Sequence, residues 1–156
     1  MSSRPSCRRV VAAKSVAAKT VAAKTAAAGT VAAVLSGVPS TVHAVATGGD
    51  PWAATLAAGS VLLPHETRRG RLVLAAAVLH GALSLGWAAV LARVLRRPTA
   101  VSGALAGLGI AALDLGLIGR RLPGIQALPQ APQVADHVAY GVAVAVVLQR
   151  WPARRP

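Results

Sequence analysis

The chain has 156 residues, of which 54% are apolar and 13% are charged. A soluble globular domain usually carries about 25% charged residues, so this composition argues against one. The 17 basic and 4 acidic residues give a net charge of +13, which in a soluble protein would point to nucleic acid. Here the charges lie between long uncharged stretches, and the composition therefore favours an integral membrane protein.

Three long stretches carry at most one charged side chain each, at 25–49, 72–92 and 98–119. A helix of about 20 residues is long enough to cross the ~30 Å hydrocarbon core of a bilayer. The sequence therefore predicts transmembrane helices.

Residues 1–25 form a basic tail that contains the repeat VAAKS VAAKT VAAKT. On a helix, a step of five residues turns each lysine by about 140°, so Lys14, Lys19 and Lys24 would form no amphipathic stripe. We expect a disordered tail. The repeat also resembles the basic tails of histone-H1-like and bacterial nucleoid proteins, which leaves nucleic-acid binding as an alternative that these few residues support weakly.

The first predicted span covers 26–47 and contains Pro39, which removes a backbone hydrogen bond and often kinks a membrane helix. A second helix is expected at 51–63, because Asp50 can cap it and Pro51 suits its first position. Thirteen residues rise only about 20 Å, so this helix is predicted to be interfacial or re-entrant.

Three further spans are predicted along the rest of the chain, at 72–92, 99–119 and 134–149, before a basic C-terminal tail at 151–156. The membrane domain then covers 26–150. The predicted fold class is all-α, a four-helix transmembrane bundle with one short interfacial or re-entrant helix.

The basic residues favour one orientation in the cell membrane. Four spans place twelve of them on the side of both termini and five on the other side, which predicts cytoplasmic termini. If the helix at 51–63 also crossed, the division would be eleven against six, so four spans are favoured narrowly. Without the N-terminal tail the four-span division is six against five, and the orientation therefore rests on that tail.

The third span carries a small-residue face. Gly103, Gly107 and Asp114 lie within about 40° of one another on a helix. Gly-x-x-x-Gly lets another helix approach closely, so Gly103 and Gly107 are predicted helix-packing residues and Asp114 is expected to face a neighbouring helix. This face also offers a route to a homo-oligomer.

Four polar residues are predicted at one depth in the bundle. His43, His80, Asp114 and His137 all fall within about 5–12 Å of the same membrane face when 1.5 Å per residue is counted along alternating helices. Imidazole and carboxylate groups suit a divalent metal such as zinc, and they also suit a proton relay. These four residues are therefore candidate metal ligands, although no H-x-x-x-H or H-E-x-x-H spacing occurs. The structural alternative is that Asp114 accepts hydrogen bonds from His80 or Ser84.

Two segments, LSGVPSTVHAVATGGDP (35–51) and AALDLGLIGRRLPGIQALPQAPQVADHVAYG (111–141), resemble a group of small uncharacterised actinobacterial multi-pass membrane proteins. The likeness covers about 30–150. It implies a membrane protein without an assigned activity, and it draws attention to the acidic and histidine residues of the matching segments: His43, Asp50, Asp114, Asp136 and His137.

The favoured hypothesis is a structural or accessory membrane protein whose polar cluster stabilises the bundle. The alternatives are a metal-ion or proton-handling transporter, and a membrane-tethered nucleic-acid binder acting through the lysine repeat. No nucleophile–base pair or known catalytic motif occurs, so we expect no enzymatic activity. The expected partners are the lipid bilayer and a second copy of the chain.

Overall fold

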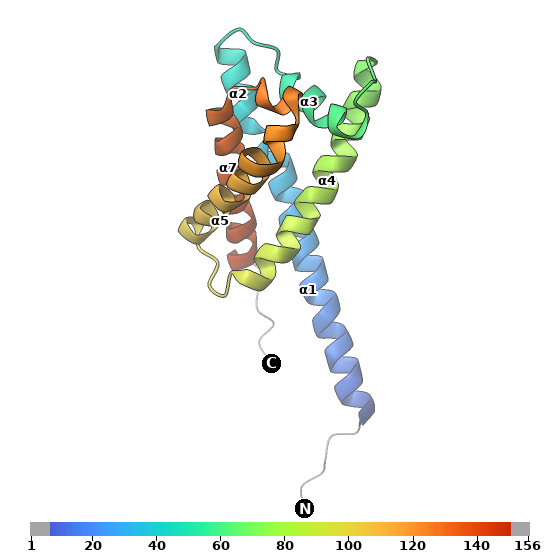
Figure 1. The fold of residues 1–156 in the computed structure, drawn as a ribbon. Coiled ribbons are helices and arrows are strands. Elements are labelled where there is room, and N and C mark those ends of the chain that lie inside the picture. Colours follow the sequence, from blue (N-terminus) through green and yellow to red (C-terminus); the bar gives the residue numbers. More distant parts are fainter. Residues whose placement is uncertain (1–6, 151–156) are drawn as a thin grey trace, which may run out of the picture.

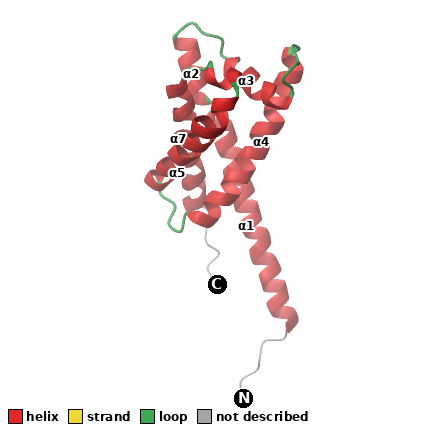
Figure 2. Ribbon diagram, viewed as in Figure 1, coloured by secondary structure: helices red, strands yellow, loops and turns green. Residues whose placement is uncertain are grey.

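Four long apolar helices make up the computed structural model, which describes the backbone of residues 7–150 and the side chains of residues 15, 16 and 18–150. The described residues form helices joined by short connections and contain no strand (Figure 2). The helices long and apolar enough to cross a membrane are Ala18–Ala46, Arg69–Val94, Ala100–Arg121 and Gln130–Arg150. The predicted all-α fold class, with four spans and one shorter apolar helix, is therefore confirmed.

The first span is broken into two helices, α1 (Cys7–Ser36) and α2 (Val38–Ala46). Pro39 lies in the first turn of α2, where its missing N–H costs no intrahelical hydrogen bond. The chain leaves α2 through Gly48, whose φ of 73° is in the left-handed region that favours glycine. The proline thus interrupts the span, as its position in the sequence suggests.

The lysine repeat is helical, which differs from the expectation of a disordered tail. α1 begins at Cys7 and projects beyond the other helices (Figure 1). Ala and Lys are strong helix formers. A helix already nucleated in the membrane span extends at little cost, because each added residue brings its own hydrogen bond. The first six residues of the predicted tail lie outside the described part of the chain.

The short helix α3 (Ala53–Leu62) packs against the start of α4 (Arg69–Val94), at the end of the bundle where α2 also lies (Figure 1). The carboxylate of Asp50 accepts a hydrogen bond from the backbone N–H of Trp52 at 2.9 Å, just before the helix. A Cβ atom at Gly59 would collide with the carbonyl of Leu72 on α4, so the two backbones touch. At 1.5 Å per residue, these ten residues are too short to cross the hydrocarbon core.

The third span changes its helical type before it ends. α5 (Ala100–Leu113) is followed by a π-helical turn, η1 (Asp114–Ile118), and a 3-10 turn, η2 (Gly119–Arg121). The short helix α6 (Pro123–Gln126) then leads to α7 (Gln130–Arg150).

α7 is the central helix, since it packs against α1, α2, α4 and α5. Among the described residues, Val144 of α7 is the largest side chain that is fully enclosed, and it belongs to a buried cluster that includes three fully buried alanines, Ala28, Ala32 and Ala88. Large apolar side chains such as Val34 and Leu74 face outward instead. Small residues at the contacts between helices, with many large apolar side chains facing outward, are typical of helices that pack within lipid.

The start of α1 and the end of α7 lie at the same end of the bundle (Figure 1). We call it the basic end, defined by Lys24, Arg93, Arg96, Arg97 and Arg150. The opposite end carries α2, α3 and α6 (Figure 1). An even number of spans requires this arrangement of the termini.

Candidate functional site: an interhelical polar cluster

Asp136 of α7 caps a helix that lies 96 residues earlier in the chain. Its Oδ1 accepts a hydrogen bond from the backbone N–H of Ser40 at 2.9 Å. Ser40 is the third residue of α2, and N–H groups in the first turn of a helix have no intrahelical partner. A negative charge is also favourable at this end of a helix dipole. The break at Pro39 thus creates an unpaired donor, and Asp136 satisfies it.

Asp114 and His137 form a second contact, between η1 and α7. Asp114 Oδ2 lies 3.5 Å from His137 Nε2, and the two side chains are 23% and 22% exposed. The other ring nitrogen, Nδ1, lies 2.8 Å from the carbonyl oxygen of Gln133. A carbonyl can only accept, so Nδ1 carries a proton and donates it.

That tautomer has a chemical consequence for the pair. Neutral His137, protonated on Nδ1, would turn the lone pair of Nε2 toward the carboxylate of Asp114, and two acceptors repel. An imidazole that also carries a proton on Nε2 removes this conflict and forms an ion pair with the carboxylate. The two groups lie at a distance longer than a normal hydrogen bond.

The π-helical turn η1 begins at Asp114, the residue that supplies the carboxylate of this pair. The backbone N–H of Gly119 donates to the carbonyl of Asp114, five residues earlier. A Cβ at Gly119 would lie 2.8 Å from that carbonyl oxygen, so a larger residue at this position would crowd the widened turn. Single π turns inside α-helices occur frequently at functional sites.

Two further polar side chains bond to the backbone of a neighbouring helix. His80 Nε2 on α4 lies 2.9 Å from the carbonyl oxygen of Ala33 on α1, to which it can only donate. The hydroxyl of Tyr140 on α7, which is buried, donates to the carbonyl of Ser84 on α4. Neither His80 nor Ser84 bonds to Asp114, in contrast to the structural alternative drawn from the sequence.

The four candidate metal ligands do not gather. Asp114 and His137 meet, but His80 bonds to Ala33, and His43 is exposed on α2. Among the residues that the structure describes, no three His, Cys, Asp or Glu side chains are placed to hold a metal ion. Equal depth in the bundle does not fix the direction in which each helix points its side chain, and this is why the expected four-ligand centre is not formed.

Gly103 and Gly107 pack against α7. A Cβ at Gly103 would collide with the carbonyl of Gly141, and a Cβ at Gly107 would collide with the carbonyl of His137. The glycine face therefore sets the distance between α5 and α7 and positions His137 beside Asp114. Because α7 of the same chain covers this face, it is not available as the route to a homo-oligomer.

Comparisons of the chain with protein-family models, curated proteins and solved structures gave no significant match. The resemblance to small actinobacterial membrane proteins stays a prediction. The contacts of the polar cluster are the basis on which a function can be proposed.

Proposed function

We propose that this protein is a non-enzymatic structural or accessory component of the cell membrane, whose intramembrane polar groups hold its own helices together. One observation carries the proposal: these polar side chains bond to the backbone of neighbouring helices. Asp136 bonds to Ser40, His80 to Ala33 and Tyr140 to Ser84. Such bonds lock the relative positions of α1, α2, α4 and α7.

The outer surface supports the same proposal. Large apolar side chains on α4 and α5, such as Leu74 and Leu105, are exposed over the length of the bundle. They would face lipid or the spans of another membrane protein. The proposal places the basic end in the cytoplasm, because basic residues are enriched on the cytoplasmic side of membrane proteins.

A second candidate function is proton handling by Asp114 and His137. It is favoured by the contact between this carboxylate and this imidazole and by the π turn that begins at Asp114. A proton-handling protein would carry protons through this pair, whereas a structural protein would use it only as an interhelical contact.

A measurement of proton flux across a membrane distinguishes the two functions. The purified protein is reconstituted into vesicles that contain a pH-sensitive dye, and a pH gradient is imposed. The structural proposal predicts that the gradient decays at the same rate as in protein-free vesicles. Faster decay that is lost in both Asp114→Asn and His137→Gln, but retained in His43→Gln, would overturn it in favour of proton handling.

A further inference from the structure

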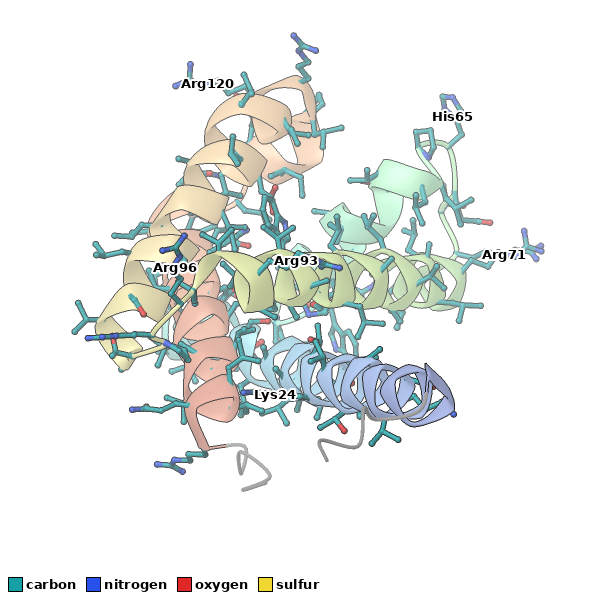
Figure 3. The ribbon with its side chains drawn as sticks, turned by 90° about the horizontal axis from the view of Figure 1, so that it is seen from below. Lys24, His65, Arg71, Arg93, Arg96 and Arg120 are labelled. Atoms are coloured by element: carbon teal, nitrogen blue, oxygen red, sulfur yellow. The ribbon has the colours of Figure 1, made fainter. Side chains whose placement is uncertain are left out.

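The basic end gathers cations from several segments without any side-chain carboxylate. Lys24 comes from α1, Arg93 from the last turn of α4 and Arg150 from the end of α7. Arg96 and Arg97 lie in the connection between α4 and α5, and Figure 3, which views the molecule from below, shows Lys24, Arg93 and Arg96 on their separate segments.

All four acidic residues of the chain are described, and they lie toward the opposite end of the bundle. There Arg69 pairs with Asp50 at 2.6 Å, and Arg71 pairs with Glu66 at 3.0 Å. Hydrogen bonds from the backbone N–H of Arg68 and from the side chain of Arg71 lower the pKa of Glu66. Arg69 and Arg71 thus have anionic partners within the chain, whereas no side-chain carboxylate lies among the cations of the basic end.

Apolar side chains lie directly beside these cations. Val94 and Val101 flank Arg96 and Arg97 in the sequence and are 66% and 71% exposed, and Leu105, one turn further along α5, is 64% exposed. Arg93 and Arg150 lie at the ends of candidate spans, and Arg96 and Arg97 lie just beyond one. A ligand that fits this surface carries a negative charge next to a long apolar chain.

We propose that the basic end binds anionic phospholipid, with the phosphate held by Arg96, Arg97 and the neighbouring cations and the acyl chain on the apolar side chains beside them. A nucleic acid would match the positive charge but not the exposed apolar side chains. Each basic residue near an anionic membrane surface contributes roughly fivefold in affinity at physiological ionic strength.

Native mass spectrometry of the detergent-solubilised protein tests the proposal with two added lipids, phosphatidylglycerol and phosphatidylcholine of the same acyl chains. The key variant is Arg96→Gln/Arg97→Gln. The matched control is Arg120→Gln/Arg121→Gln, which removes two charges from a turn near the opposite end. We expect the parent to prefer phosphatidylglycerol, the key variant to lose about 25-fold in affinity for it, and the control to keep the affinity of the parent.

Equal binding of the two lipids, or an equal loss in both variants, would overturn the proposal. Displacement of phosphatidylglycerol by a short DNA duplex at physiological salt would also overturn it, and would assign the surface to nucleic acid. If Arg96→Gln/Arg97→Gln fails to fold, two other measurements test the proposal. The charge-retaining Arg96→Lys/Arg97→Lys variant must keep the preference for phosphatidylglycerol, and the preference of the parent must weaken as salt is added.

Discussion

The carboxylate of Asp136 lies 2.9 Å from the backbone nitrogen of Ser40 and joins two helices that are 96 residues apart in the chain. The helix break at Pro39 supplies the donor, and α7 supplies the acceptor. A kink in one span is thereby stabilised by a charged group from another. The same principle, a polar side chain on a neighbour's backbone, recurs at His80 and Tyr140.

The α5–α7 contact predicts that Gly107→Ala destabilises the bundle. The added methyl group would collide with the carbonyl of His137, and overpacking of this kind costs about 1–3 kcal/mol. Gly109→Ala is the matched control, because nothing lies within 4 Å of a Cβ at that position. Thermal unfolding in detergent should show a lower midpoint for Gly107→Ala only. Equal midpoints for the two variants would contradict the close packing.

The hydroxyl of Tyr140 predicts a smaller effect. Tyr140→Phe removes its hydrogen bond to the carbonyl of Ser84 and should cost about 1 kcal/mol of unfolding free energy. Thr41→Val removes a hydroxyl that bonds only to the carbonyl of Gly37 in its own segment. Denaturant unfolding should rank Tyr140→Phe as the more destabilised, and the reverse order would argue against an interhelical role for Tyr140.

Asp114 and His137 should be energetically coupled. Each single substitution by Ala leaves the remaining polar group without its partner, so the double variant should lose less than the sum of the singles. Residues in contact show coupling energies of about 0.5–3 kcal/mol in such a cycle. Unfolding of the four proteins measures it, and additive losses would show that the pair does not interact.

Cys7, the one cysteine of the chain, reports the orientation of the basic end. If that end is cytoplasmic, a membrane-impermeant maleimide should label Cys7 only after cells are permeabilised. The matched variant, Cys7→Ser with His65→Cys, moves the thiol to the connection between α3 and α4 and should be labelled in intact cells. The opposite labelling pattern would invert the proposed topology.

The spans could be predicted from the sequence because their signal is local. A long apolar stretch with almost no charged residues has few structural alternatives to a transmembrane helix. The packing of Gly103 and Gly107 against a helix likewise follows from a four-residue spacing. The helical state of the lysine repeat was missed because the absence of an amphipathic stripe says nothing about helix propensity.

The polar cluster was harder to predict because it depends on how separate helices are rotated. His43 has the depth expected for the cluster but points outward, whereas Asp136 reaches Ser40 because α7 packs beside α2. One signal was available: Pro39 within a span leaves N–H donors of the following turn without partners, and an intramembrane acidic residue is the acceptor such donors need.

Unfolding of Asp136→Ala, alone and with Pro39→Ala, tests the central claim most directly. We predict that Asp136→Ala, which removes the acceptor for the Ser40 N–H, costs about 0.5–2 kcal/mol in the parent background, the usual range when a helix cap is replaced by alanine. The cost should shrink when Pro39→Ala lets Ser40 bond to the carbonyl of Ser36 in a continuous helix. An unchanged stability of Asp136→Ala in the parent background would contradict the claim that this carboxylate holds the bundle together.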